Sequence, residues 1–204
     1  KTKLISQYYN IENKKISGND YSGTYARMFP MSGLLLATPL INRKSNIAIT
    51  PKLSLILNGS QPSSDKVSNE ESTNSAYSLL NYQSLNRYIG TDKLDNSKRL
   101  NYGVDISKDL LKLSLSQSYE FDANSNYNKD MGIKDYMSDL LGSVSFDGLN
   151  NDLQHNFRYN VDQGLIKSQS FTYKNKNILG TSEFNYSQER VENNSILENS
   201  TETL

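Results

Sequence analysis

Few side chains in this 204-residue chain could carry out a reaction. His155 is the only histidine, and it alternates in phase with Leu153 and Phe157, on an apolar series. A general base or an activated nucleophile needs a reactive neighbour, and no Gly-x-Ser-x-Gly segment supplies one. The chain has no cysteine, so thiolate nucleophiles, thiolate metal sites and disulfides are excluded from this segment. We therefore predict that the chain is not an enzyme and has neither catalytic residues nor a cofactor.

Carboxylates in two polar stretches are the remaining candidates for metal ligands. Glu70 and Glu71 lie in one stretch, and Asp92 and Asp95 lie in the next. Carboxylate oxygens suit calcium and magnesium, but this spacing matches no EF-hand loop. Solvated loop acids are the preferred interpretation, so no metal site is predicted. A divalent cation shared with a phosphate-bearing ligand stays open as the alternative.

Basic side chains on alternating segments could contact an anionic or sugar ligand. Lys112, Arg158 and Lys174 are the candidates, although simple solvation explains scattered charges equally well. Lys+Arg and Asp+Glu both number 22, so no net field attracts a polyanion. Basic residues are not interleaved with aromatic ones, and no glycine-rich phosphate loop is present. The sequence therefore predicts no nucleic-acid partner.

Alternation of apolar and polar residues dominates the chain. Apolar residues occupy every second position of 47–57, and 111–121 and 153–161 alternate in the same way. A period of two is typical of a strand with one apolar and one polar face. We predict an all-β chain of eight or nine antiparallel strands. The expected strands cover residues 3–11, 21–40, 47–57, 99–107, 111–121, 140–146, 153–161, 165–174 and 178–191.

The connections between these strands are unequal in length. Polar loops are expected over about 59–99 and 122–137, a tight turn at Asp147-Gly148, and loop again over the last dozen residues. Long strands joined alternately by short and long connections are typical of a transmembrane β-barrel. The 14 tyrosines fit an aromatic girdle, and they fit an exposed sheet as well. A soluble β-sheet or a solenoid is the alternative architecture.

Four short motifs, in order, resemble segments of the LptD (OstA/Imp) family of lipopolysaccharide-assembly outer-membrane proteins. Residues 49–55, Ile-Thr-Pro-Lys-Leu-Ser-Leu, resemble the family's (I/L)-x-P-(K/R)-x-x-L strand. Residues 69–72, Asn-Glu-Glu-Ser, resemble its acidic-Ser loop motif, with Glu71 where Asp is usual. Residues 86–93 resemble N-R-(F/Y)-S-G-x-D-R, with Ile89 replacing Ser and Lys93 replacing Arg.

The fourth motif, residues 99–104, resembles the R-x-x-Y-G-(L/V) strand that follows in the family. The resemblance covers about 47–107, extends upstream to 27–40, and gives way to generic barrel strands beyond residue 135. The motif residues that it marks as structural positions of a rim loop are Pro51, Glu71, Ser72, Arg87, Gly90, Asp92, Tyr102 and Gly103. We hypothesise that Arg87 and Asp92 hold this loop in place through an arginine–carboxylate pair.

Membership of this family implies that residues 1–204 are an internal part of a larger outer-membrane β-barrel in a Gram-negative bacterium. The implied function is transport of lipopolysaccharide and its insertion into the outer leaflet. The implied partners are lipopolysaccharide, an LptE-like lipoprotein plug, outer-membrane lipid and a periplasmic Lpt bridge reached through an N-terminal domain outside this segment.

Physical chemistry makes this role intelligible. The apolar positions Leu111, Leu113 and Leu115 would face lipid, and the intervening polar positions would line a hydrated lumen. The alternatives are a generic outer-membrane channel or receptor barrel, or a soluble β-sheet binding module.

Overall fold

The computed structural model describes residues 1–59, 66–68, 72, 76–123, 132–178, 180–190 and 196–203, the last group by its backbone alone. Every regular element in these residues is a β-strand, which confirms the predicted all-β class. No helix in the described residues is long and apolar enough to cross a membrane.

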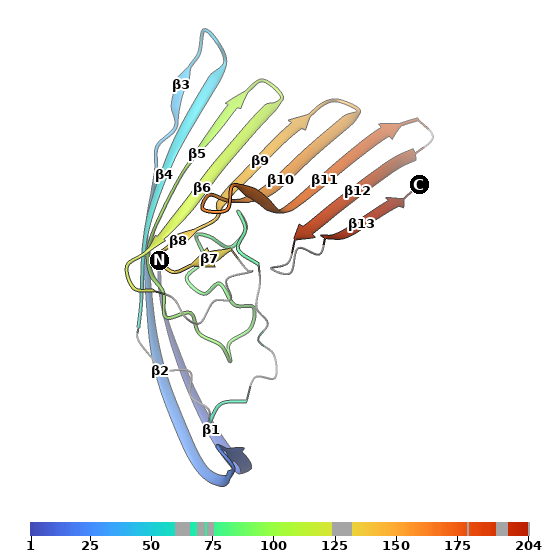
Figure 1. The fold of residues 1–204 in the computed structure, drawn as a ribbon. Coiled ribbons are helices and arrows are strands. Elements are labelled where there is room, and N and C mark those ends of the chain that lie inside the picture. Colours follow the sequence, from blue (N-terminus) through green and yellow to red (C-terminus); the bar gives the residue numbers. More distant parts are fainter. Residues whose placement is uncertain are drawn as a thin grey trace.

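The strands form one antiparallel sheet that curves through space (Figure 1). Its main ladder runs β1-β2-β4-β5-β6-β9-β10-β11-β12-β13, so neighbours in sequence are almost always neighbours in the sheet. The strands are β1 (Thr2–Ile16), β2 (Asn19–Ala37), β3 (Leu40–Asn42), β4 (Ile47–Asn58), β5 (Lys98–Lys108), β6 (Leu111–Glu120), β7 (Ile133–Lys134), β8 (Met137–Ser138), β9 (Leu140–Asp147), β10 (Asn151–Asn160), β11 (Leu165–Asn177), β12 (Gly180–Arg190) and β13 (Ile196–Thr203).

The described residues form thirteen strands where eight or nine were expected, and the additional ones are the short β3, β7 and β8 and the polar β13. The last residues were expected to be loop, but β13 pairs with β12, because the hydrogen bonds of a ladder come from the backbone and do not require apolar side chains. The first hairpin turns tightly at Ser17-Gly18, both with positive φ, so β1 is longer than predicted. The second polar loop contains the small hairpin β7–β8.

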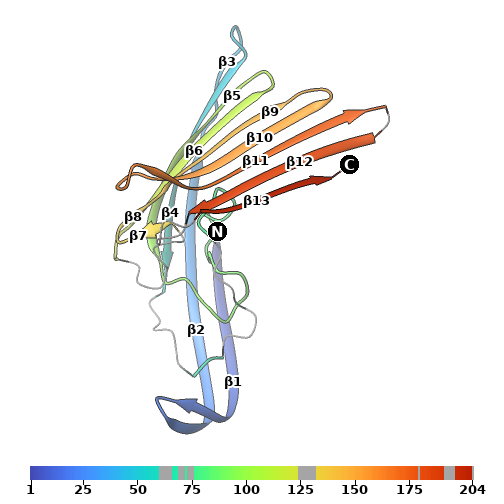
Figure 2. The ribbon, with the colours of Figure 1, turned by 45° about the vertical axis from the view of Figure 1, so that its right-hand side comes forward.

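Both long connections, after β4 and β6, begin at the same end of the sheet. The short turns after β3, β5, β9 and β11 lie together at one end, which is the upper end in Figure 1. Residues 76–97, the β7–β8 hairpin and the short turn between β10 and β11 lie toward the opposite end, and the β1–β2 hairpin projects there (Figures 1 and 2). The expected loop over about 59–99 corresponds to the connection between Asn58 and Lys98.

Strand register places the apolar side chains on one face of the sheet. Leu55 on β4 pairs with Leu100 on β5, which pairs in turn with Tyr119 on β6. This apolar face is solvent-exposed rather than covered. Exposed members on five of its strands are Leu34 (60%), Leu36 (56%), Leu53 (43%), Leu57 (47%), Leu111 (49%), Phe146 (41%) and Phe184 (40%).

The opposite, polar face is partly covered by residues 76–97, here termed the docked segment. This segment lies within the curve of the sheet (Figures 1 and 2). The two buried apolar clusters form where it meets the sheet and its loops. One comprises Tyr77, Tyr82, Tyr88, Ile133 and Leu141, and the other comprises Ile5, Phe29 and Met31 with Leu85 and Leu94 packed against them.

Candidate functional site on the polar face

Charged side chains form the centre of the contact between the docked segment and the sheet. Arg99 on β5 pairs across the ladder with Glu120 on β6, and both side chains are almost completely buried. Arg87 and Asp95 of the docked segment are equally buried beside them. Burial of charge is costly unless each group is paired, so the arrangement of these four groups determines whether the segment can dock.

The four groups form a charge-balanced network. Arg87 contacts Asp95 through Nε and Nη2, at 2.6 and 3.1 Å, and contacts Oε1 of Glu120 through Nη1 at 2.7 Å. Arg99 Nη1 lies 3.3 Å from Asp95 Oδ2. Ser97 Oγ donates to Glu120 Oε2 at 2.6 Å. Two arginines and two carboxylates therefore neutralise one another out of contact with water, and the bidentate pair fixes their geometry.

The pKa of Asp95 reflects this surrounding charge. Burial alone would raise the pKa, but Arg87 and Arg99 more than offset it, so the pKa of Asp95 is below its usual value. The pKa of Tyr77 is raised, because burial disfavours the phenolate. Both side chains therefore remain in their ordinary ionic states at neutral pH, Asp95 charged and Tyr77 neutral.

Carboxamide and hydroxyl groups complete the attachment of the docked segment. Asn58, at the end of β4, donates from Nδ2 to the carbonyls of Leu85 and Asp95, both at 2.7 Å. Tyr77 hydrogen-bonds through its hydroxyl to Ser118 on β6. Asn86 donates to the carbonyls of Gly90 and Lys93, and accepts from the backbone N–H of Asp95. These bonds hold the segment in a single path without regular secondary structure.

Several motif residues separated in sequence meet around the docked segment. Ser72 Oγ accepts from the backbone N–H groups of Asp92 and Lys93, at 2.8 and 3.0 Å. Arg27, in the upstream extension of the resemblance, donates to the carbonyl of Thr91 at 2.8 Å. Gly90 has a φ of 86°, a conformation that glycine adopts without strain. Glu71 lies outside the described residues.

The guanidinium of Arg87 has Asp95 and Glu120 as carboxylate partners in the structure, where the hypothesis named Asp92. Asp92 meets Ser72 through its backbone. The sequence could have indicated that Glu120 lies beside Arg99, because the two residues are equally far from the β5–β6 turn and therefore pair across the hairpin. Asp95 could not be assigned in this way, because its partners depend on how the docked segment folds back. Asp95 therefore lies in an ion pair with arginine, rather than in the open loop considered for a cation.

The remaining motif residues lie on β4 and β5. Pro51 is the register partner of Val104, on the apolar face. Tyr102, also on that face, donates from its hydroxyl to Gln117 at 2.7 Å. A side chain on Gly103 would collide with Ser116 on β6, so this position permits close approach of the two strands. These residues shape the wall and do not touch the buried charges.

The three basic side chains considered for anion binding all have carboxylate neighbours. Lys112 pairs with Asp147 at 2.6 Å, and Lys174 pairs with Glu183 at 3.0 Å. Arg158 lies 3.6 Å from Asp139 and 3.7 Å from Glu189. Burial raises the pKa of Asp139, an effect that Arg158 reduces but does not cancel. The polar face therefore carries mixed charge rather than a cationic patch.

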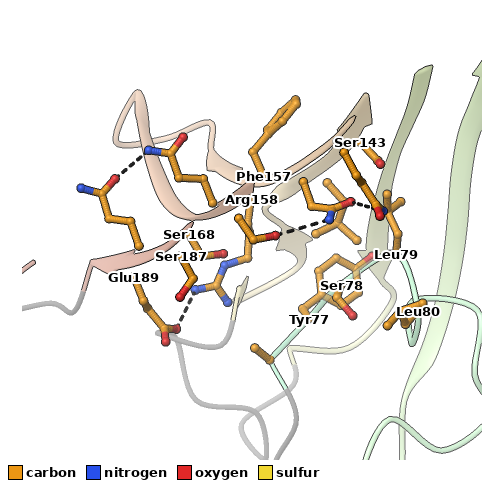
Figure 3. Close-up of a pocket in the computed structure, with 18 of the residues that line it drawn as sticks. Tyr77, Ser78, Leu79, Leu80, Ser143, Phe157, Arg158, Ser168, Ser187 and Glu189 are labelled. Atoms are coloured by element: carbon orange, nitrogen blue, oxygen red, sulfur yellow. Dashed lines mark hydrogen bonds and ion pairs between the residues drawn. The ribbon is translucent and has the colours of Figure 1, made fainter. Parts of the chain in front are cut away.

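A cavity of about 580 Å³ lies between the start of the docked segment and strands β6 and β9–β12 (Figure 3). Tyr77, Ser78, Leu79 and Leu80 form one side, and Arg158 and Glu189 lie together on the other. Most of the remaining lining consists of serine, asparagine and glutamine side chains. Such a cavity can hydrogen-bond a polar molecule in several orientations.

The only histidine takes no part in this site. His155 lies on the apolar face, with its ring 5.8 Å from that of Phe157 and Nε2 3.3 Å from Oε1 of Gln169. Within the described ranges, no cluster of three histidine, cysteine, aspartate or glutamate side chains could hold a metal ion.

Comparison with known proteins does not assign the chain to a family. No protein-family model matches the sequence, and no curated protein matches it.

Proposed function

We propose that this chain is part of the wall of an outer-membrane β-barrel that transports lipopolysaccharide and inserts it into the outer leaflet. The observation that carries the proposal is the inverted distribution of side chains. Leucine and aromatic residues are exposed across the outer face of the sheet, while arginine, aspartate and glutamate are buried on the inner one. A leucine left in water forgoes about 1.5–3 kcal/mol of burial energy, and a continuous series of them is unfavourable outside a membrane or an interface.

The dimensions of the apolar face fit a bilayer. The outward apolar positions of β4 run from Ile47 to Leu57, a rise of about 34 Å at about 3.4 Å per residue. With a strand tilt of about 45°, this length covers about 24 Å along the membrane normal, close to the apolar band of about 25 Å in outer-membrane barrels. The connections at one end are all short, and both long ones lie at the other end, which also fits this class.

The resemblance to the LptD family supports lipopolysaccharide as the cargo. Arg27 of the upstream extension and Ser72 of the second motif contact the third motif, residues 86–93, within the docked segment, and the fourth motif supplies the buried Arg99. Together they tie an inner loop to the polar face of the sheet. An LptE-like plug and a periplasmic Lpt bridge belong to the proposal as the partners of the complete barrel.

A generic outer-membrane channel or receptor is the second candidate, and the polar cavity is the observation that favours it. Depletion of the full protein in cells separates the two functions. The lipopolysaccharide proposal expects surface-labelled lipopolysaccharide to fall severalfold while uptake of small solutes is unchanged. Unchanged surface lipopolysaccharide with reduced solute uptake would reject it in favour of the channel.

A further inference from the structure

A row of short polar side chains crosses five neighbouring strands beneath the docked segment. Register partners from strand to strand, these are Ser114 on β6, Ser143 on β9, Asn156 on β10, Ser170 on β11 and Ser187 on β12. Neighbouring strands lie about 4.8 Å apart, so the row spans about 19 Å with one hydroxyl or carboxamide per strand. Because the side chains are short, the cavity lies directly above them.

The hydroxyl groups of this row are available to a ligand. Asn156 donates to Ser170 at 3.3 Å. Within the described part of the chain, the hydroxyls of Ser114, Ser143 and Ser187 have no hydrogen-bond partner, and their side chains are half-buried or exposed. Each hydroxyl can donate one hydrogen bond and accept two. The floor of the cavity can therefore bond to a molecule that carries donors and acceptors at short, regular intervals.

The charges around the cavity do not favour an anionic ligand. Arg158, the basic residue in its lining, is accompanied by Asp139 and Glu189. Carboxylates accept from the same guanidinium N–H groups as a phosphate does, so Asp139 and Glu189 would compete with a phosphate for Arg158. The cavity therefore suits an uncharged polar molecule better than a phosphorylated one.

The opposite side of the cavity is mainly apolar. Leu79 and Leu80 line the side opposite the serine row, and Leu80 is almost fully exposed, whereas the ring of Tyr77 is buried beside them (Figure 3). A pyranose ring offers hydroxyl groups along its edge and C–H groups on its faces. A polar floor with an apolar roof matches that chemistry, because each side can meet the part of the ring that it complements.

From this geometry we infer that the cavity binds an uncharged, hydroxyl-rich segment of a glycan. The inference rests on the proposed function, in which the sugar portion of lipopolysaccharide passes the polar face. It goes beyond that function in two ways. It specifies that the sugars bound here are neutral rather than phosphorylated, and it identifies the serine row as the surface that binds them.

The test uses the full chain purified in detergent, with maltohexaose and maltohexaose bearing a terminal phosphate as probes, and with binding measured by equilibrium dialysis. Ser143→Leu fills the floor of the cavity, and Ser187→Leu does so on a more exposed strand that tolerates a larger side chain. Ser145→Leu is the matched control, because Ser145 lies on the same strand and face as Ser143 but outside the cavity lining.

Saturable binding of maltohexaose supports the inference if Ser143→Leu and Ser187→Leu weaken it at least tenfold and Ser145→Leu changes it less than twofold. The phosphorylated probe should bind no more tightly than the neutral one. The inference is overturned by an absence of saturable binding, by an equal loss in the control, or by a tenfold preference for the phosphorylated probe.

Failure here is distinguishable from failure of the proposed function. A protein that inserts into outer-membrane vesicles and supports surface lipopolysaccharide, but binds no maltohexaose, overturns the glycan site alone. A protein that does not insert overturns the membrane proposal, whatever its affinity for sugar.

Discussion

At the scale of single residues, the buried network depends on Arg87. This one guanidinium contacts both Asp95 and Glu120, and all three side chains are almost fully buried. Removing one partner of a buried ion pair leaves charge without compensation, whereas an exposed pair contributes little. The same chain offers both kinds of pair, because Lys98 and Asp122 form an exposed one.

Arg87→Gln is expected to lower the free energy of unfolding by about 3–5 kcal/mol, as for other broken buried pairs. Lys98→Ala is the control, and its loss should be at most about 1 kcal/mol. Urea titration of the full protein in detergent, followed by tyrosine fluorescence, measures both. Equal effects of the two substitutions would show that the network does not hold the docked segment.

The lowered pKa of Asp95 predicts how stability depends on pH. A carboxyl whose pKa is lower in the folded state than in the unfolded state stabilises the fold above its unfolded pKa. That contribution is lost as the pH falls below the ordinary value of 3.8 and through the lower folded pKa. Asp95→Asn should therefore reduce this acid-dependent loss of stability. Thermal unfolding between pH 7 and pH 2 tests this, and identical pH profiles for the two proteins would contradict it.

At the scale of elements, the strands could be predicted and the path of the docked segment could not. Alternation such as that of 47–57 is a local pattern, so it identifies both the strand and its apolar face. The position of Asp95 depends on how the docked segment folds back onto β5 and β6, and no local pattern encodes that path. Strand β13 was missed because its residues are polar, although its backbone pairs normally with β12.

Close approach between β5 and β6 requires glycine at position 103. A Cβ there would lie 2.6 Å from the carbonyl oxygen of Leu115 and would also overlap Ser116. Gly103→Ala is expected to lower stability by about 1–3 kcal/mol through overpacking. Ser107→Ala, on the same strand and face, is the control and should change stability by less than about 1 kcal/mol. Urea titration compares them, and an unaffected Gly103→Ala variant would mean that the strands can separate without cost.

At the scale of the whole molecule, the central claim is that the apolar face meets lipid. The sheet exposes leucine and aromatic side chains on one side and buries charge on the other, which is the reverse of a soluble protein. Periodicity indicated which residues share each face. It could not show that the polar face would be the covered one, because that depends on the docked segment.

A pair of lysine substitutions on one strand tests this claim most directly. Leu53 lies near the middle of β4 on the apolar face, and Thr50 lies on the polar face of the same strand, opposite Asp105. In lipid vesicles, Leu53→Lys should destabilise the full protein, lowering its free energy of unfolding by about 2–4 kcal/mol, the cost of a lysine facing the bilayer midplane. Thr50→Lys should change it by less than about 1 kcal/mol. If Leu53→Lys has no cost, or the protein folds as a soluble monomer without lipid or detergent, the apolar face does not meet a membrane.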